Sequence, residues 1–201
     1  MRCAAAWIIL TAALHAEAAV PEDFTCKGIG LGAAEGDMLT IFGEPMFDAE
    51  RMTMGIHMKY YTFKNGYTVG VAVNTGKVLD IKIEDDRYEA RDGIKIGATA
   101  YKIENVYGAQ ERVLLDGEKF YIYTNPEAAH ERLLLSVDAE DNYLLRWRIT
   151  ELPLTEEEAD EMALEDDWDN PDLTAQMMME REIDTSALPE PAPVRLEMEN
   201  A

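Results

Sequence analysis

The chain has 201 residues and a formal net charge of -22, because 18 lysine and arginine residues stand against 40 aspartate and glutamate residues. So negative a chain lacks the clustered basic surface that normally binds nucleic acid or anionic lipid. Its length allows one ordinary domain or two very small ones that share an interface.

The first residues have the features of a secretory signal peptide. A charged start, Met1-Arg2, precedes a short apolar run from Cys3 to Leu14 and a group of small residues that ends at Ala19. The apolar run is shorter than the roughly 20 residues that span a bilayer. We expect a signal peptide at residues 1–18, cleavage near Ala18, and a secreted or periplasmic chain without a membrane span.

Cys26 bears on both lipidation and disulfide formation. It lies well beyond the apolar run, whereas a lipid-anchored export signal has its cysteine directly after that run, so no lipid anchor is expected. Loss of Cys3 with the signal peptide leaves Cys26 without a partner in its own chain. A half-buried thiol is the favoured interpretation, and intermolecular pairing is the alternative.

A glycine-rich motif occurs twice, at an offset of 65 residues. Gly28-Ile29-Gly30-Leu31-Gly32-Ala33 aligns with Gly93-Ile94-Lys95-Ile96-Gly97-Ala98. Each copy is followed by apolar residues at helical spacing and then by Gly43 or Gly108, where glycine permits the left-handed C-terminal conformation. The pattern predicts two short helices, each of which ends at a glycine.

Alternating apolar segments after each helix predict antiparallel strands. They cover about 57–64, 67–74 and 78–85 in the first half, and 118–125, 132–139 and 142–149 in the second. The fold class is therefore α+β, with two tandem repeats at 19–87 and 88–150, each a short helix on a three- to four-stranded antiparallel meander. Alternation predicts that one sheet face is buried by Tyr67, Val69, Val71, Val73, Leu79, Ile81, Ile83, Leu133, Leu135 and Val137.

The helical motif resembles that of a known family. The stretch from Gly32 to Pro45, a short amphipathic helix and then Gly43-Glu44-Pro45 before a meander, is similar to the SmpA/OmlA (BamE-like) outer-membrane assembly lipoproteins. Two copies in one chain resemble the β-lactamase inhibitor proteins (BLIP-like architecture). The resemblance implies a non-enzymatic extracytoplasmic module that presents a sheet to another protein.

Residues 151–201 form a strongly acidic tail. Residues 150–201 hold 17 acidic residues against two basic ones. Thr155-Glu156-Glu157-Glu158 is a capping box that predicts a helix to about Asp166, followed by a second short helix at 176–183 and a disordered proline-rich end. The tail either stays solvated or makes an intramolecular contact with Arg146 and Arg148 that covers the open sheet face.

The sequence offers little for catalysis or metal binding. Ser136 lies within a predicted strand, and His57 and His130 are expected at a strand start and in a connection. Three or four closely spaced ligands for zinc are not found. We therefore expect no catalytic residue, no metal site and no cofactor, and an enzyme of unfamiliar type is the least favoured of three hypotheses.

The favoured hypothesis is a module that binds another extracytoplasmic protein through its open sheet face, and the alternative is an envelope protein that binds a small ligand or a cation. Tyrosine and arginine are enriched at interface hot spots. A second interpretation places Tyr121 and Tyr123 at the seam between the repeats, and a register change of one residue would exchange the faces. The candidate interface residues are Tyr60, Tyr121, Tyr123, Leu134, Arg146 and Arg148.

Overall fold

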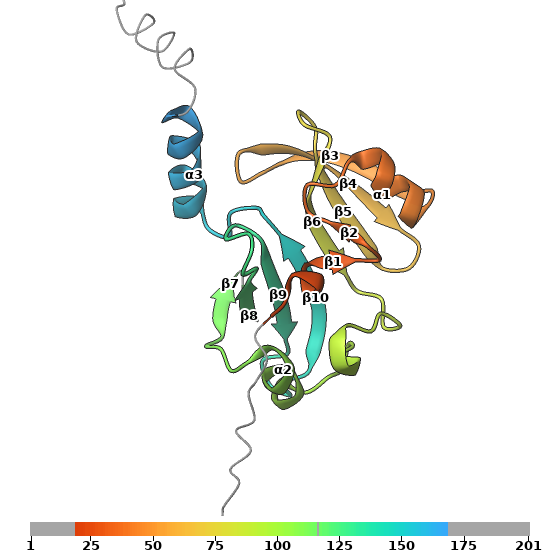
Figure 1. Cartoon of the computed structure of the whole chain (residues 1–201), viewed down its shortest axis with the longest axis vertical. Helices are drawn as coiled ribbons and strands as arrows, with labels where there is room; N and C mark the ends of the chain where they lie inside the picture. The colour runs from red at the N-terminus through yellow and green to blue at the C-terminus, as the bar shows by residue number, and fades with distance from the viewer. Residues whose placement is uncertain (1–18, 116, 169–201) are drawn as a thin grey trace, which may run out of the picture. The chain divides into compact units, whose positions relative to one another are not determined.

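The computed structural model describes residues 19–115 and 117–168 (Figure 1). The predicted signal peptide, the predicted helix at 176–183 and the proline-rich end lie outside the described residues. In chain order the elements are η1 (Pro21–Phe24), β1 (Thr25–Cys26), β2 (Ile29–Gly30), α1 (Glu35–Phe42), β3 (Phe47–Thr53), β4 (Ile56–Phe63), β5 (Tyr67–Ala72), β6 (Lys77–Ile83), η2 (Arg91–Gly93), α2 (Ala100–Tyr107), β7 (Val113–Leu115), β8 (Glu118–Thr124), β9 (Arg132–Val137), β10 (Leu144–Thr150) and α3 (Glu156–Trp168).

The main sheet has eight antiparallel strands in the order β3-β4-β5-β6-β10-β9-β8-β7, which confirms the α+β class. The last strands of the two halves, β6 and β10, lie side by side at its centre, with Trp147 opposite Ile83 and Ile149 opposite Ile81 (Figure 1). The outer strands β3 and β7 pair with β4 and β8. Neither β3 nor β7 was predicted from the alternation of apolar residues. All of β3 except its last residue is exposed, so this strand has no buried face that would produce an alternating pattern.

Both predicted helices form, and each ends at its predicted glycine. Gly43 follows α1 with a φ of 84° and Gly108 follows α2 with a φ of 91°, values that a residue with a Cβ adopts only under strain. The two helices begin at Glu35 and Ala100, which are separated by the same 65 residues as the glycine motifs. The prediction that each helix ends at a glycine is therefore confirmed, while ψ values of -157° at Gly43 and 152° at Gly108 place both residues outside the left-handed helical conformation.

The segment before each helix is attached to the last strand of its own half by matching backbone hydrogen bonds. The amide of Gly32 donates to Val78 O and that of Val78 donates to Ala33 O, both within 2.9 Å. In the second half the amide of Gly97 donates to Leu144 O. Leu144 in turn donates to Ala98 O, and both of these bonds are 2.8 Å long. These bonds hold each helix against the same face of the sheet.

One hydrophobic core fills the space between that face and the helices. Met38 of α1 and Ile103 of α2 are completely buried in it. The strands contribute Tyr67, Val69, Val71, Ile81, Ile83, Leu133, Leu135 and Val137, all of which were predicted to face the core. Trp147 at the sheet centre packs edge-on against Tyr88, with ring centroids 5.3 Å apart.

Two residues predicted for the core lie elsewhere. The register of β5 and β6 shifts between Gly70 and Val71, so that Gly70 lies opposite Asp80 but Val71 lies opposite Val78. The extra residue in this bulge is Leu79, which packs on the opposite face with Met58 and Tyr60. Val73 follows the end of β5 and is 43% exposed. A bulge cannot be recognised from alternation, which is why Leu79 was misassigned.

The described residues up to Glu156 form one compact unit, and α3 apart from its first residue belongs to a second unit that starts at Glu157. Both predicted repeats thus lie within the first unit. Helix α3 follows Thr155, close to the start and end predicted from the capping box. Among the described residues, no helix combines the length and the apolar character needed to cross a membrane.

Candidate binding site on the open sheet face

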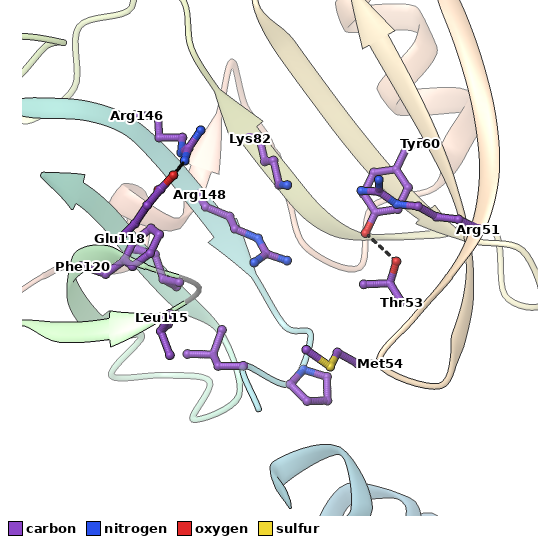
Figure 2. A pocket seen from close by; sticks show the side chains of 13 residues that line it. Arg51, Thr53, Met54, Tyr60, Lys82, Leu115, Glu118, Phe120, Arg146 and Arg148 are labelled. Carbon is purple, nitrogen blue, oxygen red and sulfur yellow. Dashed lines mark hydrogen bonds and ion pairs between the residues drawn. The ribbon is translucent and has the colours of Figure 1, made fainter. Parts of the chain in front are cut away.

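The face of the sheet opposite α1 and α2 contains a cavity of about 310 Å³. Side chains from both halves surround it, and Figure 2 shows basic groups from β3, β6 and β10 around the same space. The lining consists of Arg51, Thr53, Met54, Tyr60, Lys82, Leu115, Glu118, Phe120, Leu134, Arg146, Arg148, Pro153 and Leu154.

Four of the six interface residues predicted from the sequence meet at this cavity: Tyr60, Leu134, Arg146 and Arg148. Tyr60 and Leu134 are themselves only 6% and 1% exposed. They therefore form the walls of the cavity, whereas the arginines remain partly accessible.

Tyr121 and Tyr123 do not belong to this face, which corrects their predicted position on the open side of the sheet. They lie in the core beneath α2, 0% and 3% exposed. The Tyr121 hydroxyl donates to Glu104 Oε1 at 2.6 Å, and the Tyr123 hydroxyl donates to Gly108 O at 2.9 Å. Burial raises the pKa of Tyr121 to about 12. Their contacts are with α2 and not with the boundary between the halves.

The side chain of Arg148, on β10, is held by the carboxylate of Asp80, which lies on β6 and is 1% exposed. Its Nε donates to Asp80 Oδ1 at 2.6 Å and its Nη2 donates to Oδ2 at 3.3 Å. This two-bond geometry is the strong form of an arginine–carboxylate pair. It satisfies the Asp80 carboxylate and fixes the guanidinium in the cavity wall.

Arg146 is the centre of a polar network that crosses four strands. It pairs with Glu118 on β8 and, at 3.2 Å, with Glu84 just after β6. The Ser136 hydroxyl donates to the other Glu118 oxygen at 3.0 Å. The Arg146 guanidinium lowers the pKa of the Glu118 carboxyl, so that this carboxylate is ionised and already neutralised at neutral pH.

Two further basic residues line the cavity, Arg51 on β3 and Lys82 on β6. Neither was among the interface residues predicted from the sequence. The Arg51 guanidinium stacks on the Tyr60 ring, with Cζ 4.0 Å from the ring centroid. Neither Arg51 nor Lys82 forms an ion pair with any residue in the part of the chain that the structure describes. Burial lowers the pKa of Lys82, and the positive charges of Arg148, Arg51 and Arg146 lower it further, while the Asp80 carboxylate acts in the opposite direction.

The remaining walls of the cavity are mostly apolar. Met54, Leu115 and Phe120 come from the edges of the sheet, and Pro153 and Leu154 come from the segment after β10. Leu152 anchors this segment, because its side chain is fully buried and its carbonyl accepts a 2.9 Å hydrogen bond from Arg132. The cavity therefore has a basic part and an apolar part.

The residues considered for hydrolytic chemistry, Ser136, His57 and His130, lie on different elements of the fold. Ser136 is fully buried and its hydroxyl is engaged by Glu118, His57 is half-exposed beside Glu50 at 3.2 Å, and His130 is exposed after β8. No group of three or more histidine, cysteine or acidic side chains that could hold a metal ion is found within the described residues.

No family model and no curated protein matches the sequence. Similar solved structures include a cysteine-rich secretory protein from Staphylococcus aureus (16% identity, 60% of this chain and 42% of that one, TM-score 0.42). An extracellular protein with an SCP domain from Bacillus anthracis has 14% identity over 64% of this chain and 51% of that one, with a TM-score of 0.43. The uncharacterized protein YfeY from Escherichia coli has 12% identity over 64% of this chain and 94% of that one, with a TM-score of 0.43.

The chain thus spans about half or less of the first two proteins.

Proposed function

We propose that this protein is an exported, non-enzymatic module that binds another extracytoplasmic protein through the open face of its sheet. The observation that carries the proposal is the cavity on that face, where aromatic, aliphatic and arginine side chains from both halves meet. Interface hot spots are rich in tyrosine and arginine and lie in pockets of this composition. The other face is occupied by the protein's own helices and core.

Export is supported by the N-terminal sequence, since the charged start, the apolar run and the small residues before Ala19 match a secretory signal peptide. The proposal places the protein outside the cytoplasm, secreted or in a periplasm.

The proposal includes a tandem repeat architecture similar to BamE-like and β-lactamase inhibitor proteins. Its support is the shared offset of 65 residues between α1 and α2, together with the matching bonds of Gly32 and Gly97 to the strands β6 and β10. In this architecture the open face is a single surface assembled from both repeats, because β6 and β10 pair at the centre.

Two neighbouring leucines of β7 allow a matched test. Leu115 lines the cavity, whereas Leu114 is 65% exposed and, as the next residue along the strand, points to the other face. The full chain, Leu115→Glu and Leu114→Glu would each be used to capture proteins from an envelope extract. The proposal predicts a retained protein that is lost with Leu115→Glu and kept with Leu114→Glu. Equal retention by both variants would contradict it.

A small ligand is the second candidate, because the cavity volume is near the lower end of the roughly 300 to 1,000 Å³ of ligand sites. The four basic side chains in its lining favour an anion over a cation at this position. Thermal stabilisation by small anions without any captured protein would support this second function.

The contact between the acidic tail and Arg146 and Arg148 remains a prediction. Arg148 already pairs with Asp80, and Arg146 already pairs with Glu118 and with Glu84. The tail is therefore not required to neutralise either arginine. A chain that ends at Glu156 keeps Leu152 and the cavity walls, whereas an end at Thr150 would remove them. If the contact exists, the chain ending at Glu156 captures the partner more strongly than the full chain at low salt, and this advantage disappears at high salt.

A further inference from the structure

The basic residues at the cavity divide into two kinds. Arg146 and Arg148 have their charges compensated by Glu118, Glu84 and Asp80. Neither Arg51 nor Lys82 makes an ion-pair contact with a carboxylate among the residues described. Lys82 lies on a central strand of the sheet, where the Asp80 carboxylate attracts it only at longer range. Partly buried charges are normally paired, so an unpaired lysine at this position is an exception that calls for a ligand.

The backbone and its neighbours direct these two charges into the cavity. Asp80 and Lys82 are two residues apart on β6 and share the open face, but the Asp80 carboxylate is occupied by both donors of Arg148. The Tyr60 ring supports the Arg51 guanidinium through a cation–π contact and leaves its N–H groups available. Gly70 makes room for that ring, because a Cβ there would lie 2.7 Å from Tyr60 Cε1.

The rest of the lining selects among anions. Met54, Leu115 and Phe120 present apolar surface to the same cavity (Figure 2). Pro153 and Leu154 also belong to its lining. Free phosphate would use the cations and leave this surface in water. A peptide that carries a carboxylate beside an apolar side chain uses both parts.

We propose that the cavity recognises an acidic and apolar peptide segment of the partner, with the carboxylate held by Lys82 and Arg51 and the apolar side chain packed against Leu115 and Phe120. This inference rests on the proposed function and narrows it to a class of binding sequence. The other basic residues, Arg146 and Arg148, mainly build the wall.

The probe is a random peptide library displayed on phage and selected on the full chain. Enriched peptides should pair aspartate or glutamate with a leucine, phenylalanine or similar residue. Synthetic copies should bind at least about tenfold more weakly to Lys82→Gln and to Arg51→Gln, since hydrogen bonds between charged groups are lost. Lys64→Gln is the matched control, because Lys64 is exposed beyond the end of β4 and is not part of the cavity.

Neither test variant removes an ion pair of the fold, and melting curves identify any variant that fails to fold. Enrichment of peptides without acidic residues, or of none, would overturn the inference, as would unchanged binding to Lys82→Gln and Arg51→Gln. Inorganic phosphate that binds as tightly as the selected peptides would show a small-anion site instead. Each of these failures is separable from the proposed function, which fails only if no envelope protein is captured through the open face.

Discussion

Arg148 and Asp80 are 68 residues apart in the sequence, yet their side chains form a two-bond ion pair across the junction of β10 and β6. The pair joins the second half of the chain to the first. It also determines which charges at the cavity are free, because the carboxylate closest to Lys82 along the strand is already occupied.

The two partners of this pair should differ in their effect on stability. Arg148→Met removes both hydrogen bonds from the Asp80 carboxylate, which is 1% exposed and keeps only the longer-range attraction of Lys82, and should lower the free energy of unfolding by about 3 to 5 kcal/mol. Asp80→Asn leaves an arginine that is a quarter exposed and can reach water, so a loss of about 1 to 3 kcal/mol is expected. Urea unfolding of both variants measures the difference, and a larger loss for Asp80→Asn would contradict this account.

Removal of the unpaired charge should have the opposite effect. Lys82→Met should raise the free energy of unfolding at neutral pH by about 0.5 to 2 kcal/mol, as expected where function has kept a destabilising group. The control Lys64→Met should change little, because Lys64 is exposed.

The pH dependence of this effect follows from the lowered pKa of Lys82. Below its native pKa the lysine is charged in both states and its destabilisation is complete. Between that pKa and the unfolded value of about 10.4 the unfolded chain binds more protons, so stability rises with pH. The advantage of Lys82→Met should therefore shrink as the pH approaches about 10. A constant advantage would show that the charge of Lys82 is not its cause.

Acid should weaken the network around Glu118. Because Arg146 lowers the native pKa of this carboxyl, its contribution is present above the unfolded value of about 4.3 and is lost as the pH falls through the native value. Unfolding measured from about pH 6 down to pH 3 should therefore show a shallower loss for Glu118→Gln than for the unmodified chain. Glu44→Gln, on an exposed residue after α1, should keep the original slope.

Cys26 should be unreactive in the folded protein. It is fully buried, and burial raises the pKa of its thiol to about 12, so the thiolate is scarce at pH 8. Alkylation with iodoacetamide followed by peptide mapping should modify Cys26 only after addition of guanidinium chloride. Rapid modification of the native chain, or a disulfide-linked dimer, would restore the alternative of intermolecular pairing.

Local sequence signals were sufficient for the parts of the fold that local chemistry determines. The glycines after α1 and α2, the hairpins and most core-facing residues were predicted, because each depends on neighbouring residues. The positions of Tyr121 and Tyr123 were not, since Phe120-Tyr121-Ile122-Tyr123 is apolar on both faces and offers no alternation.

The cavity could not be predicted from any single segment of the sequence, because its lining comes from both halves of the chain. Arg51 belongs to β3, whose exposed residues do not have the pattern of a half-buried strand. Alternation with the core residues Ile81 and Ile83 is consistent with Lys82 on the open face, but its lack of an ion-pair contact depends on Arg148 occupying Asp80 from the other half of the chain. Arg148 and Asp80 meet because β10 pairs with β6. These two strands are far apart in the sequence, so this pairing cannot be inferred from local patterns.

The most direct test of the central claim is photocrosslinking from the two sheet faces in the producing cells. A photoreactive residue at position 115 lines the cavity, and one at position 114 of the same strand points to the other face. The account predicts a discrete crosslinked protein from position 115 and none from position 114. Crosslinks of equal yield from both positions, or from position 114 only, would contradict a partner bound at the open face.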